Sequence, residues 1–352
     1  MRLTKEIQPI IDRCCKFTRY SAISPELSCL CFDEGTITAY NGISGIIHLM
    51  GIDIQPMVVP ASSVKELLNS LGELNLLSEL GSISISSGKR FSSKFSNLLK
   101  SLPRWDFKVP TPDETELLPE KVFSGLQKVY FSVSTDETKA DMRGVFCSGG
   151  YIYSTDNALM TRFPVDLGKI VDFFIPDNLL GYIIDEQRGP VGYSLDSTKI
   201  WFVFEDFVVF GQRFLGDFPN CKSVFESSKL TSEVKFDSTE LGKVLDRFSF
   251  FVNSHPYLVD LVITPQGQLI VDAIASGIEF LTELVECETN VRDEIGFSVH
   301  INFLKKIVSK SNRFYVNDSF LHFFSDSGLE SLLFKPLVVD PRGAISRVVK
   351  FI

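Results

Sequence analysis

A glycine-centred turn followed by a strand-like segment occurs three times along this 352-residue chain at almost constant spacing. The turn glycines are Gly35, Gly150 and Gly267, which lie 115 and 117 residues apart. A strand-like segment also precedes each turn, which is typical of a β-hairpin. An internal repeat of this length constrains the fold more than any single motif, because each copy should fold into the same unit.

Amphipathic helices accompany each predicted hairpin in the same order. Apolar spacing predicts a first helix before each hairpin, over residues 6–18, 121–131 and 240–252. It predicts a second helix after each hairpin, over residues 60–71, 176–186 and 300–310. Strand-like segments then close the repeats, over residues 82–95, 191–214 and 313–337. We therefore predict an α+β fold of three similar domains, with boundaries at 1–111, 112–228 and 229–352.

The predicted helices separate an apolar stripe from a basic one. In the first helix, for example, Ile7, Ile11 and Cys14 lie on one side, and Lys5 and Lys16 lie on the other. The basic residues expected on exposed helix faces and an adjoining loop are Lys5, Lys16, Arg19, Lys121, Lys128, Lys243, Arg247, Lys305, Lys306 and Lys310.

The whole chain carries a net charge of −9, so any basic surface must be local. Lysines gathered on helices that face a common side would contact phosphates without reading bases. The alternative is that these lysines only solvate the exposed helix faces.

Composition and motifs argue against a membrane protein, a metalloprotein and an enzyme. Hydrophobic residues make up 44% of the chain, but no apolar segment reaches the ~18 residues of a membrane span, and residues 1–6 lack a signal-peptide core. We expect a cytoplasmic protein with reduced thiols. Cys29 and Cys31 share a strand face without a second ligand pair, so no metal or cofactor is expected. The four histidines have no nucleophile partner at a recognisable spacing, and glycine-rich phosphate loops are absent, so we do not expect an enzyme. Asp156 could be interpreted as catalytic, but we expect it to form an Asx turn.

The middle repeat resembles the bacterial sliding clamp family, the β subunit of DNA polymerase III. The segments that carry the resemblance, in chain order, are 131–134, 142–145, 153–156, 173–176 and 213–219, together with 294–297 in the third repeat. The resemblance implies a homodimeric ring around double-stranded DNA, with helices inside and sheets outside. It also implies a processivity factor without catalysis, served by a DNA polymerase and a clamp loader.

The resemblance further implies a peptide-binding pocket between the second and third domains. By position, its residues are Met142, Thr155, Asn157, Ala158, Leu159, Met160, Pro219, Ser223, Val224, Val348, Val349, Phe351 and Ile352. Two segments depart from the family: residues 157–159 replace Gly-His-Arg, and residues 348–352 replace a Met-Pro-Met-Arg-Leu-like ending. A less polar rim predicts an altered peptide preference. We interpret the chain as a divergent clamp. One hypothesis for its origin is that a phage encodes it and that it acts in the host cytoplasm.

The resemblance implies a ring seam between the third domain of one chain and the first domain of the other. The matching apolar residues are Phe250 and Phe251, facing Phe95 and Leu98. The alternative is that these are ordinary core residues. A second alternative concerns the whole protein: a clamp-like peptide-binding adaptor or decoy that does not encircle DNA would have the same domain order.

Overall fold

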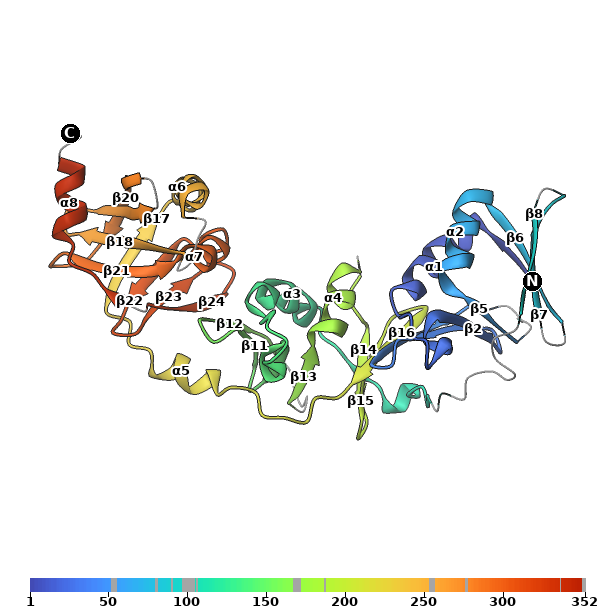
Figure 1. Cartoon of the computed structure of the whole chain (residues 1–352). Helices are drawn as coiled ribbons and strands as arrows, with labels where there is room; N and C mark the ends of the chain where they lie inside the picture. Colours follow the sequence, from blue (N-terminus) through green and yellow to red (C-terminus); the bar gives the residue numbers. More distant parts are fainter. Residues whose placement is uncertain are drawn as a thin grey trace. The chain divides into compact units, whose positions relative to one another are not determined.

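The computed structural model describes residues 1–51, 56–79, 82–89, 91–96, 105, 107–166, 172–186, 188–252, 257–275, 278–335 and 337–349. Its described strands form three antiparallel sheets covered by helices, which confirms the predicted α+β class (Figure 1). The chain forms two compact units. Unit 1 consists of Met1–Glu120 and Asn178–Phe214, and unit 2 consists of Lys121–Asp177 and Leu215–Ile352.

The order of elements repeats three times: a leading strand, a first helix, four strands, a second helix and three strands. The first repeat contains β1 (Arg2–Thr4), α1 (Gln8–Cys15), β2 (Cys29–Asp33), β3 (Thr36–Tyr40), β4 (Ser44–Leu49), β5 (Met57–Pro60), α2 (Ala61–Leu71), β6 (Glu73–Glu79), β7 (Ser82–Ser87) and β8 (Phe91–Ser96). The second contains β9 (Glu116–Leu117), α3 (Glu120–Val129), β10 (Gly144–Ser148), β11 (Tyr151–Thr155), β12 (Leu159–Pro164), β13 (Phe173–Pro176), α4 (Asp177–Asp185), β14 (Gly192–Leu195), β15 (Lys199–Val203) and β16 (Phe207–Gln212). The third contains β17 (Ser232–Phe236), α6 (Ser238–Phe251), β18 (Leu258–Thr264), β19 (Gln268–Ala275), β20 (Ile278–Thr289), β21 (Ile295–His300), α7 (Ile301–Val308), β22 (Arg313–Val316), β23 (Phe320–Phe324) and β24 (Glu330–Phe334).

The three hairpins form where the glycines predict them. β2 pairs with β3, β10 with β11, and β18 with β19, all antiparallel. Gly35, Gly150 and Gly267 adopt φ values of 77°, 83° and 82°. This left-handed conformation strains residues with a Cβ atom, so glycine is the residue that permits each turn.

Unit 1 contains two sheets. The larger has the strand order β5-β2-β3-β4-β16-β15-β14-β9, and the smaller has the order β1-β6-β7-β8. The larger sheet joins strands of the first and second repeats, because β4 pairs with β16. The helices of this unit bury the faces that their spacing predicts: Ile11 and Cys14 are fully buried.

Unit 2 contains one long sheet, in the order β13-β10-β11-β12-β24-β23-β22-β17-β20-β19-β18-β21-β25, where β25 is Leu337–Val338. Here β12 pairs with β24, which joins the second and third repeats. α6 and α7 pack Leu241, Phe248 and Leu304 into the core of the third repeat. The predicted apolar stripes of both helices are therefore buried.

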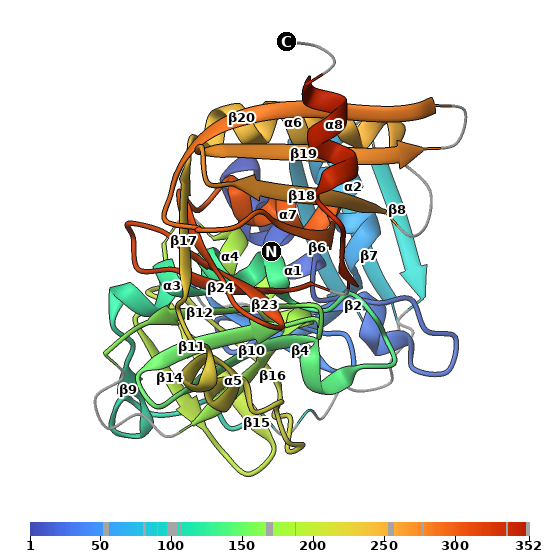
Figure 2. The ribbon, with the colours of Figure 1, turned by 90° about the vertical axis from the view of Figure 1, so that its left-hand side faces the viewer.

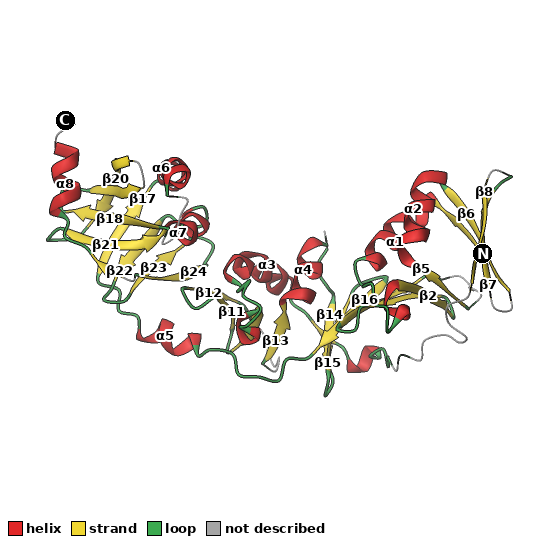
Figure 3. Cartoon of the chain, in the orientation of Figure 1, coloured by secondary structure: helices red, strands yellow, loops and turns green. Residues whose placement is uncertain are grey.

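Two helices in unit 2 were not predicted. α5 (Cys221–Ser227) begins after Asn220, whose side chain accepts a hydrogen bond from the Ser223 backbone. α8 (Arg342–Val349) lies across β19 and β20, on the face opposite α6 and α7 (Figure 2). It is held there by an ion pair between Arg347 and Asp272. Figure 3 shows how helices and strands are distributed in each unit.

Candidate partner site and repeat junctions

The turn between β11 and β12, together with the strand residue on either side of it, carries four of the predicted pocket residues. The Asp156 side chain accepts hydrogen bonds from the backbone of Ala158 (3.0 Å) and Leu159 (2.8 Å), which confirms the predicted Asx turn. Thr155 Oγ1 donates to the Leu159 carbonyl at 3.0 Å and accepts from the Asn157 backbone at 3.0 Å. Asn157 is exposed with φ of 84°. The turn is therefore fixed by its own side chains.

The residues after this turn alternate between two faces of β12. Leu159 is fully buried in the core shared with the third repeat. Met160 points to the other face and packs against an apolar cluster under α5. The structure thus separates these two predicted pocket residues.

The cluster under α5, named here the α5 cluster, brings several predicted pocket residues together. Its members are Tyr153, Cys221, Phe225 and Leu332, with the half-buried Phe146, Tyr151, Met160, Phe218, Val224 and Phe320 packed against them. Val224 and Met160 are therefore neighbours in one cluster. Pro219 lies just before α5 and is half-buried, Ser223 is exposed on α5, and Met142 is half-buried.

Of the predicted C-terminal strip, only Val348 has a described side chain. Val348 packs with Val262, Ile270 and Ala344 between α8 and its sheet, a cluster separate from the α5 cluster. The side chain of Val349, and Phe351 and Ile352, lie outside the described residues.

An ionic network beside the α5 cluster, in which Arg162 and Glu330 are half-buried and His322 is buried, was not predicted. Arg162 Nη2 donates to Glu330 Oε2 at 2.8 Å, across the strand pair that joins β12 to β24. His322 Nε2 lies 3.1 Å from the same oxygen. The Arg162 guanidinium also lies between the rings of Tyr151 and Phe225, 4.6 and 4.5 Å from their centroids. Arginine suits such a site because its planar group can pair and stack together.

The environment of Glu330 changes its acidity. Burial alone would raise its pKa, but hydrogen bonds from His322 and Arg162 outweigh burial and leave the pKa below its ordinary value. Glu330 therefore stays ionised at neutral pH and completes the pair. We call this strand pair, with its ionic network, the second junction.

The equivalent strand pair in unit 1, β4 with β16, is the first junction. Here Ile47 faces Val208 in register, where the second junction has Arg162 facing Glu330. His48 is buried at the end of β4, and its Nε2 lies 3.2 Å from Asp206. Burial lowers the His48 pKa, and Asp206 only partly opposes this.

A cavity of about 650 Å³ opens beside the first junction. Its lining residues are Arg13, Asp185, Glu186, Arg188, Gly189, Val191, Phe204, Glu205, Asp206 and Phe207. Arg13 lies over the Phe207 ring at 4.4 Å and pairs with both carboxylate oxygens of Glu186, at 3.1 and 3.3 Å. Arg188 pairs with Glu205 at 3.1 Å. The arginines of this cavity are thus neutralised by its carboxylates.

The ten predicted basic residues fall into two groups. Three have a carboxylate partner: Lys16 with Asp185, Arg247 with Glu283, and Lys305 with Asp246. For the other seven, no carboxylate lies within ion-pair distance in the described part of the chain. These are Lys5, Arg19, Lys121, Lys128, Lys243, Lys306 and Lys310.

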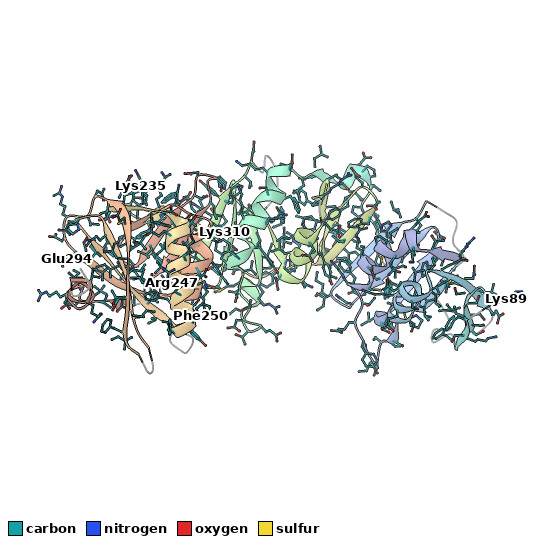
Figure 4. All side chains as sticks on the ribbon, turned by 90° about the horizontal axis from the view of Figure 1, so that it is seen from above. Lys89, Lys235, Arg247, Phe250, Glu294 and Lys310 are labelled. Atoms are coloured by element: carbon teal, nitrogen blue, oxygen red, sulfur yellow. The ribbon has the colours of Figure 1, made fainter. Side chains whose placement is uncertain are left out.

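The predicted seam residues are only partly described. Phe250 and Phe251 lie at the end of α6 with 76% and 44% of their surface exposed, so they are not core residues. Phe250 is labelled in Figure 4. Phe95 is half-buried on β8, and Leu98 lies outside the described residues. β8 is an edge strand of its sheet.

Signs of other chemistry are scarce. All seven cysteines are free thiols, and burial raises the pKa of Cys31 to about 12. Among the described residues, no group of histidine, cysteine and carboxylate side chains could hold a metal ion. None of the described helices is long and apolar enough to cross a membrane.

Comparison with solved structures identifies the fold. The chain superimposes on the β subunit of DNA polymerase III from Pseudomonas aeruginosa with a TM-score of 0.82 at 17% identity, covering 96% of this chain and 99% of the other. A β sliding clamp from C. crescentus gives 0.80 at 17% identity, covering 96% and 98%. The β subunit from Thermotoga maritima gives 0.77 at 15% identity, covering 96% and 99%. No family sequence model and no curated protein sequence matches the chain.

The protein therefore has the sliding-clamp fold. More narrowly, the fold is that of the β subunits of bacterial DNA polymerase III, and it extends over nearly the whole chain.

Proposed function

We propose that this protein is a divergent DNA sliding clamp, a non-catalytic processivity factor of the DNA polymerase III β-subunit family. It encircles duplex DNA as a homodimer and tethers a polymerase and a clamp loader. The observation that carries the proposal is the match to sliding clamps over 96% of this chain and 99% of theirs. A protein that did not form a ring would not need to keep the architecture of a ring subunit over its whole length.

The three proposed domains span 1–111, 112–228 and 229–352. The threefold order of elements supports these boundaries. The compact units divide the chain differently because the β4–β16 and β12–β24 pairs join sheets across the proposed boundaries. Each of these pairs is an antiparallel ladder of the same kind as those within a domain.

The strand pairs also support ring closure by a second copy. At both junctions, the third strand after a first helix pairs with the last strand of the next repeat. In the third repeat that strand is β20, and its residues 278–286 pair only with β19 in the described part of the chain. The last strand of the first repeat is the edge strand β8. Pairing β20 with β8 of a second copy satisfies both open edges and closes a two-chain ring.

Exposed aromatic side chains support the same seam. Phe250 and Phe251 lie at the end of α6, whose Arg247 is ion-paired with Glu283 of β20. We propose that these phenylalanines face Phe95 and Leu98 of the second copy. Aromatic residues exposed beside an open strand edge are typical of an interface.

The proposed docking site for a partner peptide is the surface formed by the β11–β12 turn and α5. Apolar groups such as Met160 and Val224 lie beside the polar turn there, which suits a short hydrophobic peptide. The buried Leu159, where the family has an arginine, supports an altered peptide preference. An altered peptide preference fits a divergent clamp, for example a phage-encoded one, that serves its own polymerase.

DNA retention tests the proposal. The wild-type protein should stay on a nicked circular plasmid during gel filtration at about 150 mM salt and slide off the linearised plasmid. The Phe251→Glu variant should weaken the dimer by about 2 kcal/mol, roughly 30-fold in Kd, and lose retention on circles. Light scattering reports the dimer directly.

The matched control is Leu117→Glu, which places the same charge on a side chain that is 83% exposed on β9, at the edge of a different sheet from β8. It should behave as wild type. Equal loss of the wild-type protein from circles and linear DNA would favour the adaptor or decoy instead. A Phe251→Glu protein that remains a dimer would show that the seam lies elsewhere.

A further inference from the structure

The second helices of the second and third repeats carry opposite charge. α4 and the residue after it contain Asp177, Asp185 and Glu186 and no basic residue. α7 and the two residues after it contain Lys305, Lys306 and Lys310 and no acidic residue. These helices occupy the same place in the repeat, so a surface built from them cannot have uniform charge.

In unit 1 the two basic residues next to α4, Arg13 and Lys16, are neutralised, whereas Lys5 and Arg19 of the same unit have no carboxylate within ion-pair distance among the described residues. Lys16 Nζ lies 3.5 Å from Asp185, and Arg13 is bidentate to Glu186. Lys65 of α2 pairs with Asp12 at 3.2 Å. The end of α1 is fixed against α4, since Phe17 stacks on Tyr182 with ring centroids 4.0 Å apart. A phosphate approaching this face would meet carboxylates that already hold the nearby cations.

In unit 2 the lysines beside α3 have a different environment. Lys128 Nζ lies 4.3 Å from the centroid of the Phe163 ring, and Lys310 Nζ lies 5.3 Å from that of Phe131. Figure 4 labels Lys310. Lys306 Nζ donates to the Phe131 carbonyl at 3.4 Å. Lys121 is exposed on α3. Phe131 lies two residues after the end of α3, so these contacts bring the two helices together into one basic surface.

These four lysines, which we name the α3–α7 lysines, have no carboxylate within ion-pair distance among the described residues. Their neighbours are aromatic rings and a carbonyl, which orient an ammonium group without cancelling its charge. Asp156 interacts electrostatically with Lys306, but its carboxylate is half-buried and already accepts two backbone hydrogen bonds. The positive charge is therefore available to an anion in solvent.

We infer that duplex contact in this protein is one-sided: the phosphate backbone is held mainly by Lys121, Lys128, Lys306 and Lys310, and not by the α1–α4 face. The inference rests on the proposed function and deepens it. A polyanion gains counterion release where free lysines lie and gains little where each cation already has a carboxylate partner. DNA would then lie closer to one part of each subunit than to the other.

Two matched double variants test this. Lys306→Gln/Lys310→Gln removes two free charges, and Lys16→Gln/Lys65→Gln removes two paired ones. Affinity for a labelled duplex is measured by fluorescence anisotropy between about 50 and 200 mM salt. Each lost phosphate contact reduces the slope of log K against log salt by about 0.9, so the first variant should lose up to about 1.8 per subunit and the second less than half of that.

The same proteins are then tested for retention on circular and linear DNA, and thermal melting verifies their fold. Lys306→Arg/Lys310→Arg should keep the wild-type slope because it keeps the charge. Equal slope changes in the two glutamine variants, with wild-type retention on circles intact, would overturn the one-sided contact and leave the clamp function standing. Equal wild-type loss from both DNA forms, with the larger slope change still at Lys306 and Lys310, would overturn encirclement and support the lysine surface.

Discussion

The two junctions use the same backbone arrangement and opposite side-chain chemistry. At the first junction, Ile47 faces Val208 among apolar and aromatic neighbours. At the second, Arg162 faces Glu330, and His322 shares the same carboxylate. An antiparallel strand pair places opposite side chains close together whatever they are, so the ladder supplies the connection and the side chains decide its strength. A repeated fold can therefore give each connection its own sensitivity to mutation and to pH.

The largest effect is expected from removing one partner of the ionic pair. Arg162→Ala leaves Glu330 with one of its two partners and opens space between the Tyr151 and Phe225 rings. We expect a loss of about 3 kcal/mol in the free energy of unfolding, because the half-buried Glu330 loses its charged partner and the two rings lose the guanidinium packed against them. Urea unfolding followed by circular dichroism measures it.

The double variant Arg162→Leu/Glu330→Leu should recover most of that loss, since two apolar groups can replace a buried ion pair. At the first junction, Ile47→Val should cost only about 1 kcal/mol. If Arg162→Ala cost no more than Ile47→Val, the ionic network would contribute little to the second junction.

The next largest effect is expected at the first junction, from Gly45. Gly45 faces Phe210 in register, and a Cβ atom there would lie 2.4 Å from the Phe210 ring and 2.9 Å from the Ala39 carbonyl. Gly45→Ala should therefore cost about 2 kcal/mol by overpacking. Trp201 belongs to the same cluster, so its fluorescence during urea unfolding reports the change.

The control for that substitution is Gly242→Ala on α6, where a Cβ atom meets nothing within 4 Å. It should stabilise the helix by about 0.5–1 kcal/mol. Equal and small effects at Gly45 and Gly242 would mean that Phe210 moves aside without cost.

Local patterns predicted much of this structure, because their physical causes are local. The apolar stripe with Leu241 and Phe248 is buried, the hairpin glycines adopt positive φ, and Asp156 forms its Asx turn. These features depend on residues within a few positions of one another. The threefold order followed from their repetition.

Long-range partners could not be predicted in the same way. Glu330 lies 168 residues after Arg162, and no local pattern links them. The seven-residue helix α5 is too short for an apolar period to appear. Leu159 was assigned by resemblance to the pocket, but the alternation of β12 buries it, and its neighbour Met160 joins the α5 cluster instead.

The smallest expected effect is a difference between the two junctions in how the free energy of unfolding depends on pH. Burial lowers the pKa of His48 below its ordinary value of 6.5, so the unfolded chain binds a proton before the folded chain does, and stability falls as pH drops below about 6.5. Arg13, which also disfavours the charged form, and Asp206, which favours it, are the charged groups that act on this ring. The depressed pKa of Glu330 also makes stability fall with pH, but only below about 4.5.

The first junction should therefore weaken at a higher pH than the second. Urea midpoints followed by Trp201 fluorescence should decrease between about pH 7.5 and 5.5 in the wild-type protein, and less so in His48→Gln, which cannot take up the proton. Glu330→Gln should leave that range unchanged and reduce the loss of stability below about pH 4.5. If the urea midpoint of His48→Gln decreased as much as that of the wild-type protein, another group would cause the decrease. The buried histidine would then not explain why the first junction weakens at a higher pH than the second.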